Sequence, residues 1–311
     1  MGNIATRQAY GEALAEIANE NKNLVVLDAD LSKSTKTAEF KAVCPERFFN
    51  MGISEGDMIT TAAGLATCGK TVFASSFAMF AAGRAYEQIR NSVAYPKLNV
   101  KVAATHAGIS VGEDGASHQC VEDLALMRVI PNMTVFSPAD DVEAREIIKY
   151  AAKTEGPMYI RLSRMGNDRI FDEKNYEFNF GKGIEVKSGK DITIVSTGIL
   201  VAESLKAAEI LSEKGIDARV ININTIKPMD KNILVKASKE TKSIVTVEEH
   251  NIIGGLGSAV LEAISETAPT KVYKIGMDDT FGRSGTPKEL LDYYGLTAEK
   301  IAKNILDNFI G

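Results

Sequence analysis

The segment Thr105-His-Ala-Gly-Ile-Ser-Val-Gly-Glu-Asp-Gly-Ala-Ser-His-Gln119 directly follows the apolar run Val100 to Ala104, which predicts a buried strand. Glycines at positions 108, 112 and 115 permit positive φ angles and so allow an irregular loop. The loop contains His106 and His118, two of the three histidines in the chain. Titratable side chains directly after a buried strand are typical of sites in α/β proteins. We therefore predict a functional site here, and not a charged turn with incidental histidines.

The composition is that of a globular protein. The chain has 311 residues, 45% hydrophobic and 25% charged, with a formal net charge of −5. No basic run favours nucleic acid, no apolar run is long enough to cross a membrane, and no signal-peptide pattern begins the chain. The cysteines at 44, 68 and 120 show neither metal-ligand nor disulfide spacing. We expect a cytoplasmic protein with reduced thiols, no nucleic-acid partner and no membrane association.

Polar residues also follow the other predicted strands and helix starts of the first half. Arg7 lies in the first turn of a helix predicted over residues 4–20, where a cation opposes the helix dipole. Asp30 and Ser34 follow the strand at 24–27 and equally suit helix caps. Glu55 begins a helix rich in small apolar residues, and Ser54 with Asp57 resembles a capping box. A carboxylate at the start of a buried helix favours a function beyond complementing the dipole.

Two further features complete the candidate site. Phe77 and Phe80 are three residues apart and are expected on one face of the helix that follows the strand at 71–75. Core packing alone would explain such a pair. Arg164 follows the strand at 158–163, and its planar donor group suits phosphate.

Alternating strands and helices predict an α/β fold of two consecutive domains, each a mostly parallel sheet flanked by helices. The first covers 1–165, and 166–189 is a polar linker with room for one short edge strand. The second domain covers 190–311. Its expected strands are 191–196, 216–223, 243–248 and 271–275, and its expected helices are 199–214, 230–240, 255–266, 287–293 and 297–309.

The quoted loop resembles a transketolase loop that usually reads G-E-D-G-P-T-H-Q, matched here by residues 112–119. Other stretches are similar to the same family. Residues 5–7 match its A-T-R, residues 29–34 its A-D-L-x-x-S, residues 52–66 its G-I-x-E-x-x-M-x-x-x-A-A-G-L-A, and residues 162–164 its L-S-R. One departure is Gly83, where the family usually has a tyrosine, with Tyr86 one turn later and one extra residue before Arg90. The resemblance leaves open whether Tyr86 replaces that third aromatic contact.

The resemblance implies thiamine diphosphate and Mg²⁺ as cofactors and a pyrimidine-binding first domain. It implies that Glu55 is the catalytic glutamate at N1′ of the aminopyrimidine, that Phe77 and Phe80 contact this ring, and that Asp30 lies near the thiazolium side. The cofactor reacts through a carbanion, and a desolvated carboxyl group that exchanges a proton with the ring promotes its formation. The remaining implied roles concern a sugar phosphate that donates the ketol unit. The oxygens of this donor sugar would contact His106 and His118. Asp114 would select a hydroxylated donor, and Arg7, Ser34 and Arg164 would bind the phosphate.

The resemblance covers only the second half of an ordinary transketolase. The G-D-G motif that holds the metal and the diphosphate in the other half is absent. The chain therefore resembles the C-terminal subunit of a split transketolase. We expect the metal and diphosphate ligands on an N-terminal-type partner, in a two-plus-two heterotetramer that also self-associates through the domains of this chain. Which sugars it uses is left open, and modified sugars such as sulfosugars remain candidates.

Three other interpretations compete with this one. The beta subunit of a 2-oxo acid dehydrogenase has a similar length and a pyrimidine-contacting glutamate, but it lacks the G-E-D-G-x-S/T-H-Q loop. Deoxyxylulose-phosphate synthase has a related loop, usually within one longer chain. A non-catalytic subunit that keeps the fold is disfavoured because Glu55, His106, Asp114, His118 and Arg164 occur together.

Overall fold

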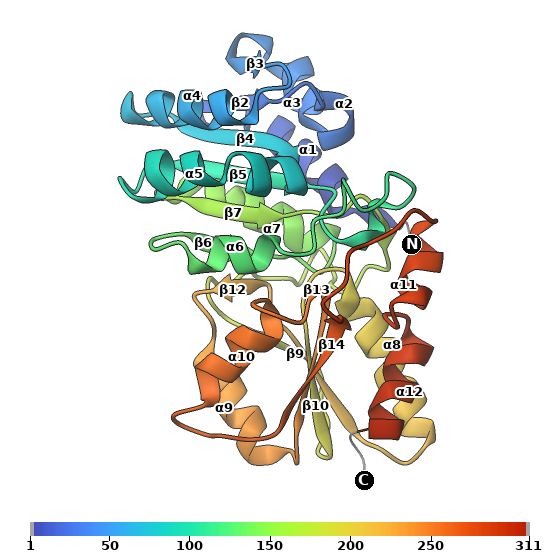
Figure 1. The fold of residues 1–311 in the computed structure, drawn as a ribbon. Coiled ribbons are helices and arrows are strands. Elements are labelled where there is room, and N and C mark those ends of the chain that lie inside the picture. The colour runs from blue at the N-terminus through green and yellow to red at the C-terminus, as the bar shows by residue number, and fades with distance from the viewer. Residues whose placement is uncertain (1–2, 309–311) are drawn as a thin grey trace.

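The computed structural model describes residues 3–308, which form two α/β units stacked end to end (Figure 1). A parallel-dominated sheet lies at the centre of each unit, with helices on both faces, as the sequence predicts. Residues 24–28 and 71–77 are buried throughout, which is typical of strands covered on both faces.

The first sheet has seven strands in the order β12-β6-β7-β5-β4-β2-β3, and all but β12 are parallel to their neighbours. Its strands are β2 (Leu24–Asp28), β3 (Phe48–Asn50), β4 (Thr71–Phe77), β5 (Val100–Thr105), β6 (Thr134–Phe136), β7 (Met158–Arg161) and β12 (Thr225–Lys227). The helices around it are α1 (Thr6–Ile17), α2 (Ser32–Thr35), α3 (Thr37–Val43), α4 (Glu55–Thr67), α5 (Tyr86–Gln88), α6 (Asp123–Val129) and α7 (Asp141–Lys153).

The second sheet has five strands in the order β14-β13-β10-β11-β9, with only the edge strand β9 antiparallel. Its strands are β9 (Ile184–Lys187), β10 (Ile192–Ser196), β11 (Ala218–Asn222), β13 (Ile244–Asn251) and β14 (Val272–Met277). Its helices are α8 (Leu200–Glu213), α9 (Lys231–Glu240), α10 (Leu256–Ile264), α11 (Pro287–Tyr293) and α12 (Ala298–Asn308). Residue 309, which the sequence places at the end of the last helix, lies outside the described residues.

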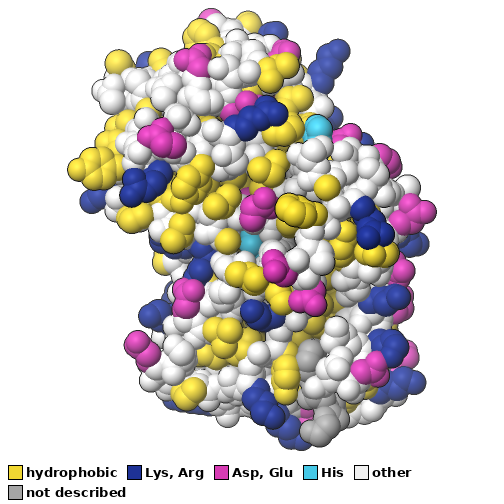
Figure 2. Space-filling model, in the orientation of Figure 1, with side chains coloured by type: hydrophobic (Ala, Val, Ile, Leu, Met, Phe, Trp, Pro, Cys, Tyr) yellow, Lys and Arg dark blue, Asp and Glu magenta, His cyan; other side chains and the backbone are white. Residues whose placement is uncertain are grey.

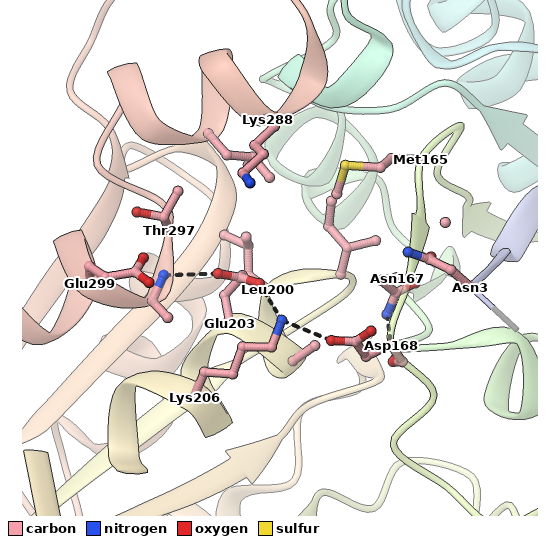
Figure 3. Close-up of a pocket in the computed structure, with 15 residues that line it drawn as sticks. Asn3, Met165, Asn167, Asp168, Leu200, Glu203, Lys206, Lys288, Thr297 and Glu299 are labelled. Carbon is pink, nitrogen blue, oxygen red and sulfur yellow. Dashed lines mark hydrogen bonds and ion pairs between the residues drawn. The ribbon is translucent and has the colours of Figure 1, made fainter. Parts of the chain in front are cut away.

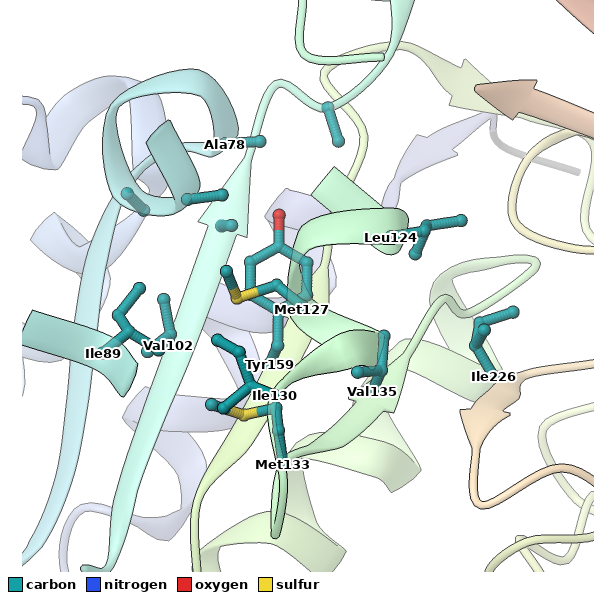
Figure 4. Close-up of a cluster of buried hydrophobic side chains, with 14 of the residues drawn as sticks. Ala78, Ile89, Val102, Leu124, Met127, Ile130, Met133, Val135, Tyr159 and Ile226 are labelled. Atoms are coloured by element: carbon teal, nitrogen blue, oxygen red, sulfur yellow. The ribbon is translucent and has the colours of Figure 1, made fainter. Parts of the chain in front are cut away.

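The two units share a hydrophobic core. β12 directly follows β11 of the second sheet in the chain, yet it pairs antiparallel with β6 of the first sheet. Ile226 on β12 therefore belongs to the same buried cluster as Val135 and Met127 of the first unit (Figure 4). The two ends of the first unit are also joined, because β1 (Ile4–Ala5) pairs antiparallel with β8 (Gly166–Asn167).

The carboxyl edge of the second sheet faces the first unit and is bonded to it. The Asn251 amide donates to the Val121 carbonyl at 2.7 Å, and the Ser137 amide donates to the Asn224 carbonyl at 2.8 Å. The Thr197 hydroxyl lies 3.3 Å from the Ser137 carbonyl. Among residues 3–308, no hydrogen bond joins the carboxyl ends of β2, β3 and β4 to the second sheet. The candidate residues lie along this edge of the first sheet.

Hydrophobic side chains gather on the face of the first unit formed by α4, α5 and α6 (Figure 2). Several large hydrophobic residues of this unit are exposed, among them Ile53 at 78%, Tyr95 at 84% and Val129 at 68%. Within residues 3–308, no helix combines the length and the apolar character needed to cross a membrane.

Candidate functional site

Glu55 is the first residue of α4 and is buried, with 4% exposure. Its Oε1 accepts from the Ser76 hydroxyl at 3.4 Å, and the Arg84 guanidinium lies 3.3 Å from both carboxylate oxygens. The predicted helix start is confirmed, but the capping box is wrong, because the Ser54 side chain makes no cap hydrogen bond. The negative charge of Glu55 in the first turn still complements the helix dipole.

Phe77 and Phe80 form a stacked pair with ring centroids 5.9 Å apart and an interplanar angle of 16°. Phe77 is the last residue of β4, so the prediction that both rings lie on one helix was wrong. The chain continues from Met79 to Arg84 as a π-helix, and a second π-helical turn covers Ile89–Ala94. Such wide turns accommodate added residues within a helix, and they occur where the sequence has one residue more than the transketolase pattern.

Arg84 is a residue that the sequence reasoning did not select. Its guanidinium lies over the Phe80 ring, 4.1 Å from the centroid, while it pairs with Glu55. Met79 occupies the space next to Gly83, where an added Cβ would lie 2.3 Å from its Cε. Tyr86 is half-buried and packs against the core. The sequence feature that could have identified Arg84 was its isolated charge in a run of small residues.

His106 is buried and its backbone is left-handed, with φ 58°. Its ring stacks on Phe77 with centroids 3.7 Å apart. Nε2 lies 3.1 Å from Arg7 Nη1, which can only donate, so Nε2 accepts. Nδ1 therefore carries the proton and donates to the Thr105 hydroxyl at 2.8 Å. Burial, together with the smaller effects of the charges of Arg7, Arg164 and His118, lowers the pKa of His106 to about 3, so the ring is neutral.

Two arginines converge on this neutral histidine. Arg7, in the first turn of α1, donates to the Ser34 carbonyl at 2.7 Å, and its buried Nε has no partner among the described residues. Burial lowers the pKa of Arg7, and the nearby charge of Arg164 contributes to the same shift. Arg164 donates to the Val111 carbonyl. Two like charges held close together are stabilised by a bound anion. The site therefore suits a phosphate or a similar group.

Asp114 and His118 occupy the tip of the loop. Asp114 Oδ2 lies 3.6 Å from Arg164 Nη1, and Glu113 Oε2 lies 3.7 Å from the same atom. The half-buried His118 ring meets the edge of Phe80 with centroids 5.1 Å apart, and its Nδ1 lies 3.0 Å from the Ser117 hydroxyl. Both histidines therefore contact the aromatic pair.

Asp30 is exposed, has φ 63°, and accepts from Asn50 Nδ2 at 2.8 Å. The loop that presents it is built on Asp28, which the sequence reasoning did not select. The buried Asp28 carboxylate accepts from the Leu31 amide at 2.6 Å and from the Thr35 and Thr37 hydroxyls at 2.6 and 2.8 Å. Burial raises the pKa of Asp28, and these hydrogen bonds oppose that shift.

A separate pocket of about 430 Å³ lies where β8 meets the starts of α8 and α12 (Figure 3). Lys206 lies on its wall with Nζ 2.8 Å from Asp168 and 3.1 Å from Glu203, and Lys288 also lines the pocket (Figure 3). None of the predicted site residues lines this pocket. Within residues 3–308 no group of three or more His, Cys, Asp or Glu side chains is placed to hold a metal ion.

Comparison with known proteins identifies the family. The transketolase pyrimidine-binding domain matches residues 2–167, and the transketolase C-terminal domain matches residues 181–301. A Methanocaldococcus jannaschii protein, provisionally named a transketolase C-terminal section, is 55% identical over 97% of this chain and 95% of its own length. The 6-deoxy-6-sulfo-D-fructose transketolase subunit of Clostridium sp. (strain MSTE9) is 40% identical over 96% of this chain and 92% of its own length.

A solved structure described as a split gene transketolase, inactive beta4 tetramer, is 54% identical and superposes with a TM-score of 0.89 over 98% of both chains. These matches do not favour a 2-oxo acid dehydrogenase subunit or a deoxyxylulose-phosphate synthase. Membership of the matched family implies thiamine diphosphate as the cofactor. The chain therefore belongs to the transketolase family, as a subunit made of the pyrimidine-binding and C-terminal domains.

Proposed function

We propose that this subunit, with an N-terminal-type partner, transfers a two-carbon ketol unit from a ketose phosphate to an aldose phosphate. One observation carries the proposal. A buried carboxylate, an aromatic pair and two arginines around a neutral histidine meet at one edge of one sheet. We propose the domain division 1–165 and 190–311, with 166–189 as the linker.

The residues around Glu55 fit the aminopyrimidine of thiamine diphosphate. Arg84 places a flat, hydrogen-bond-donating group over Phe80 and against Glu55. A protonated aminopyrimidine is also flat and would donate to the same carboxylate. We propose that the ring takes the place of the Arg84 guanidinium, between Glu55 and the pair Phe77 and Phe80, with Asp30 nearby.

Each chain residue then has a defined task. When bound, thiamine diphosphate supplies the nucleophilic carbon for the donor carbonyl. Glu55 exchanges a proton with the ring nitrogen, and its burial keeps water from competing. His118 and the neutral His106 hydrogen-bond the donor oxygens and move protons there. His106 can do so only once the substrate displaces its contact with Arg7.

The remaining side chains would recognise the rest of the sugar. Arg7 and Arg164 would bind the terminal phosphate together with Ser34, since two guanidinium groups provide donors in a fixed geometry. A phosphate bound there would also draw Arg164 away from Asp114. The freed Asp114 carboxylate would then accept a hydrogen bond from a donor hydroxyl. A sulfonate has similar charge and acceptor geometry, so a sulfosugar fits the same reasoning.

We propose that the Mg²⁺ and diphosphate ligands belong to the partner, and that two copies of each chain assemble. The word subunit in the name of the Clostridium relative and the split-gene description of the solved structure support a partner. Exposed apolar side chains such as Ile53, Tyr95 and Val129 also favour burial against other chains. The tetramer in the description of the solved structure supports self-association.

Reconstitution tests this proposal. The purified chain, with Mg²⁺ and thiamine diphosphate, should show neither ketol transfer nor tight cofactor binding by calorimetric titration. Adding a transketolase N-terminal-type chain should restore both, with sugar phosphates and sulfosugars compared as donors. Turnover and tight binding by the isolated chain would refute the need for a partner. A cofactor-loaded complex with no transfer from any ketose would refute the reaction.

A further inference from the structure

The loop from His106 to Gln119 rests on the second unit at two places. At its base, the buried Glu249 carboxylate of β13 accepts from the Ser110 amide at 2.6 Å. Gly108 lies directly above this carboxylate, with φ 78°, and an added Cβ would lie 2.3 Å from Glu249 Cδ. The Glu249 side chain therefore packs directly against the Gly108 backbone, with no room for a Cβ between them.

The second support is the segment Phe281–Pro287, which covers the end of the connection from β14 to α11 and the first residue of α11. An added Cβ on Gly115 would lie 2.6 Å from the Ser284 hydroxyl, and one on Gly112 would lie 3.1 Å from Pro287 Cδ. The segment is itself fixed, because Thr286 and Glu289 form a complete capping box at the start of α11. The tip of the loop, which presents Asp114 and His118, therefore lies against a fixed surface.

Gln119 connects this surface to the loop. The side chain is 3% exposed, and Nε2 donates to the Arg283 carbonyl at 2.9 Å. The same nitrogen lies 3.2 Å from the Ile109 carbonyl and 3.3 Å from the Gly112 carbonyl, so one amide joins both ends of the loop. Its Oε1 has no hydrogen-bond partner among the described residues, and an added Cβ on Gly282 would lie 1.7 Å from it.

We infer that Gln119 and Gly282 form a positioning pair that sets where His118 and Asp114 stand. His118 is bonded covalently to Gln119, so a shift of the buried amide moves the histidine relative to Phe80. The second unit thereby takes part in donor recognition through the first unit's loop. This inference rests on the proposed function, because it assigns the loop to the donor.

Gly282→Ala tests the pair. Gly282 does not have a positive φ, so its backbone tolerates alanine, but the new methyl group must displace the Gln119 amide. In the reconstituted complex we expect kcat/KM for the ketose donor to fall roughly 10- to 100-fold, as for a misplacement of about 1 Å. Affinity for thiamine diphosphate should not change, because the hydrogen bonds and ring contacts of Glu55, Phe77 and Phe80 among the described residues do not involve Phe281–Pro287.

Gly285→Ala is the matched control, because its added Cβ would meet Leu290 at 3.2 Å and not Gln119. Gln119→Ala tests the pair without adding any atoms to the buried site, because it only shortens a side chain. It should lower kcat/KM for the ketose donor as well. In the Gln119→Ala background, Gly282→Ala should have little further effect, because the group that it displaces is gone. Equal losses from Gly282→Ala and Gly285→Ala, or additive losses in the double variant, would overturn the inference.

Hydrogen exchange in peptides covering residues 106–119 provides a readout that is independent of turnover. Exchange should rise in Gly282→Ala and Gln119→Ala, and should match wild type in Gly285→Ala. Unchanged exchange in the first two variants would refute the positioning pair even with normal transketolase activity. Faster exchange in a complex that never transfers ketol units would keep the pair and refute the proposed function.

Discussion

The carboxyl edges of the two parallel sheets carry similar polar residues but use them differently. In the second sheet, Glu248 accepts from the Leu256 and Gly257 amides at 2.6 and 2.8 Å, and Glu249 accepts from Ser110. Burial raises the pKa of both carboxyl groups, and these hydrogen bonds oppose that shift. At the edge of the first sheet, Glu55 pairs with Arg84, whose side chain is largely exposed, and Arg7 contacts the His106 ring and the Ser34 carbonyl.

The difference teaches that a sheet edge serves as a site only where a neighbouring unit does not bind its polar groups. The hydrogen bonds of Glu248 stay within the second unit, but others at this edge end on the first unit, and the buried Glu143 of α7 is one example. It accepts from Asn222, Asn224 and Tyr176 side chains at 2.9, 2.7 and 2.7 Å. Buried polar networks stabilise one arrangement when their groups have partners, and in this one Asn222 Oδ1 has no partner among the described residues.

Glu55→Gln should have the largest effect on activity at the open edge. Glutamine keeps the shape but cannot exchange a proton, so kcat of the cofactor-saturated complex should fall by roughly 10²- to 10⁴-fold. Assembly with the partner should not change. Asp57→Asn is the matched control, because Asp57 is an exposed acid in the same first turn. Turnover of Glu55→Gln at the level of Asp57→Asn would contradict the assigned role.

Glu143→Ala should have the largest effect on stability at the covered edge. It leaves the buried amides of Asn222 and Asn224 and the Tyr176 hydroxyl without their acceptor. The free energy of unfolding should fall by about 3 kcal/mol or more, measured by denaturant titration. Glu146→Ala on the same helix removes only a partly exposed pair with Lys149 and should cost less than about 1 kcal/mol. If Glu143→Ala and Glu146→Ala lowered the free energy of unfolding by similar amounts, the polar groups of the second edge would not be stabilising the contact between the two units.

Much of the fold could be predicted because parallel strands give long buried runs and helices give apolar stripes. The order of strands and helices in the second unit follows the sequence to within a few residues. β12 was missed because its three residues form a strand only by pairing with β6 of the other unit. Local sequence carries no signal for such a tertiary pairing.

The candidate site could be located from the sequence because its residues follow strand ends, which one sheet brings to one edge. The local shape could not be predicted. Phe77 ends a strand, and the π-helix at Met79–Arg84 depends on how the added residue is accommodated. Arg84 was missed because its role comes from a contact with Glu55, which is distant in sequence. Asp28 was missed although its partners Leu31, Thr35 and Thr37 are near in sequence, because the loop shape that brings them to its carboxylate has no simple sequence pattern.

Asp114→Ala should change donor choice more than overall stability. If the Asp114 carboxylate accepts a hydrogen bond from a hydroxyl of the donor sugar, its loss should lower kcat/KM for hydroxylated donor sugars by roughly 10-fold or more. Pyruvate-like donors, which lack that hydroxyl, should be affected less. Glu113→Ala, next in the loop and at a similar distance from Arg164, is the matched control. Equal losses for the two donor types would count against this use of Asp114.

The last prediction concerns pH and the neutral His106. Its pKa is about 3 in the folded chain, against about 6.5 in an unfolded one. Between these values the unfolded chain binds a proton that the folded chain does not, so His106 makes stability rise with pH from about 3 to about 6.5. His106→Asn should reduce this slope, measured as the free energy of unfolding of the isolated chain across the window.

His118→Asn is the control for this measurement. Burial and the charges of Arg7 and Arg164 lower the pKa of His106 more than His118 does. Replacing His118 should therefore reduce the slope only slightly, whereas replacing His106 removes its contribution altogether. If His106→Asn keeps the full wild-type slope, the ring is not held neutral by its surroundings. The open edge would then contain a histidine that titrates as it does in water, and Arg7 would donate to it only above about pH 6.5, where the ring is neutral.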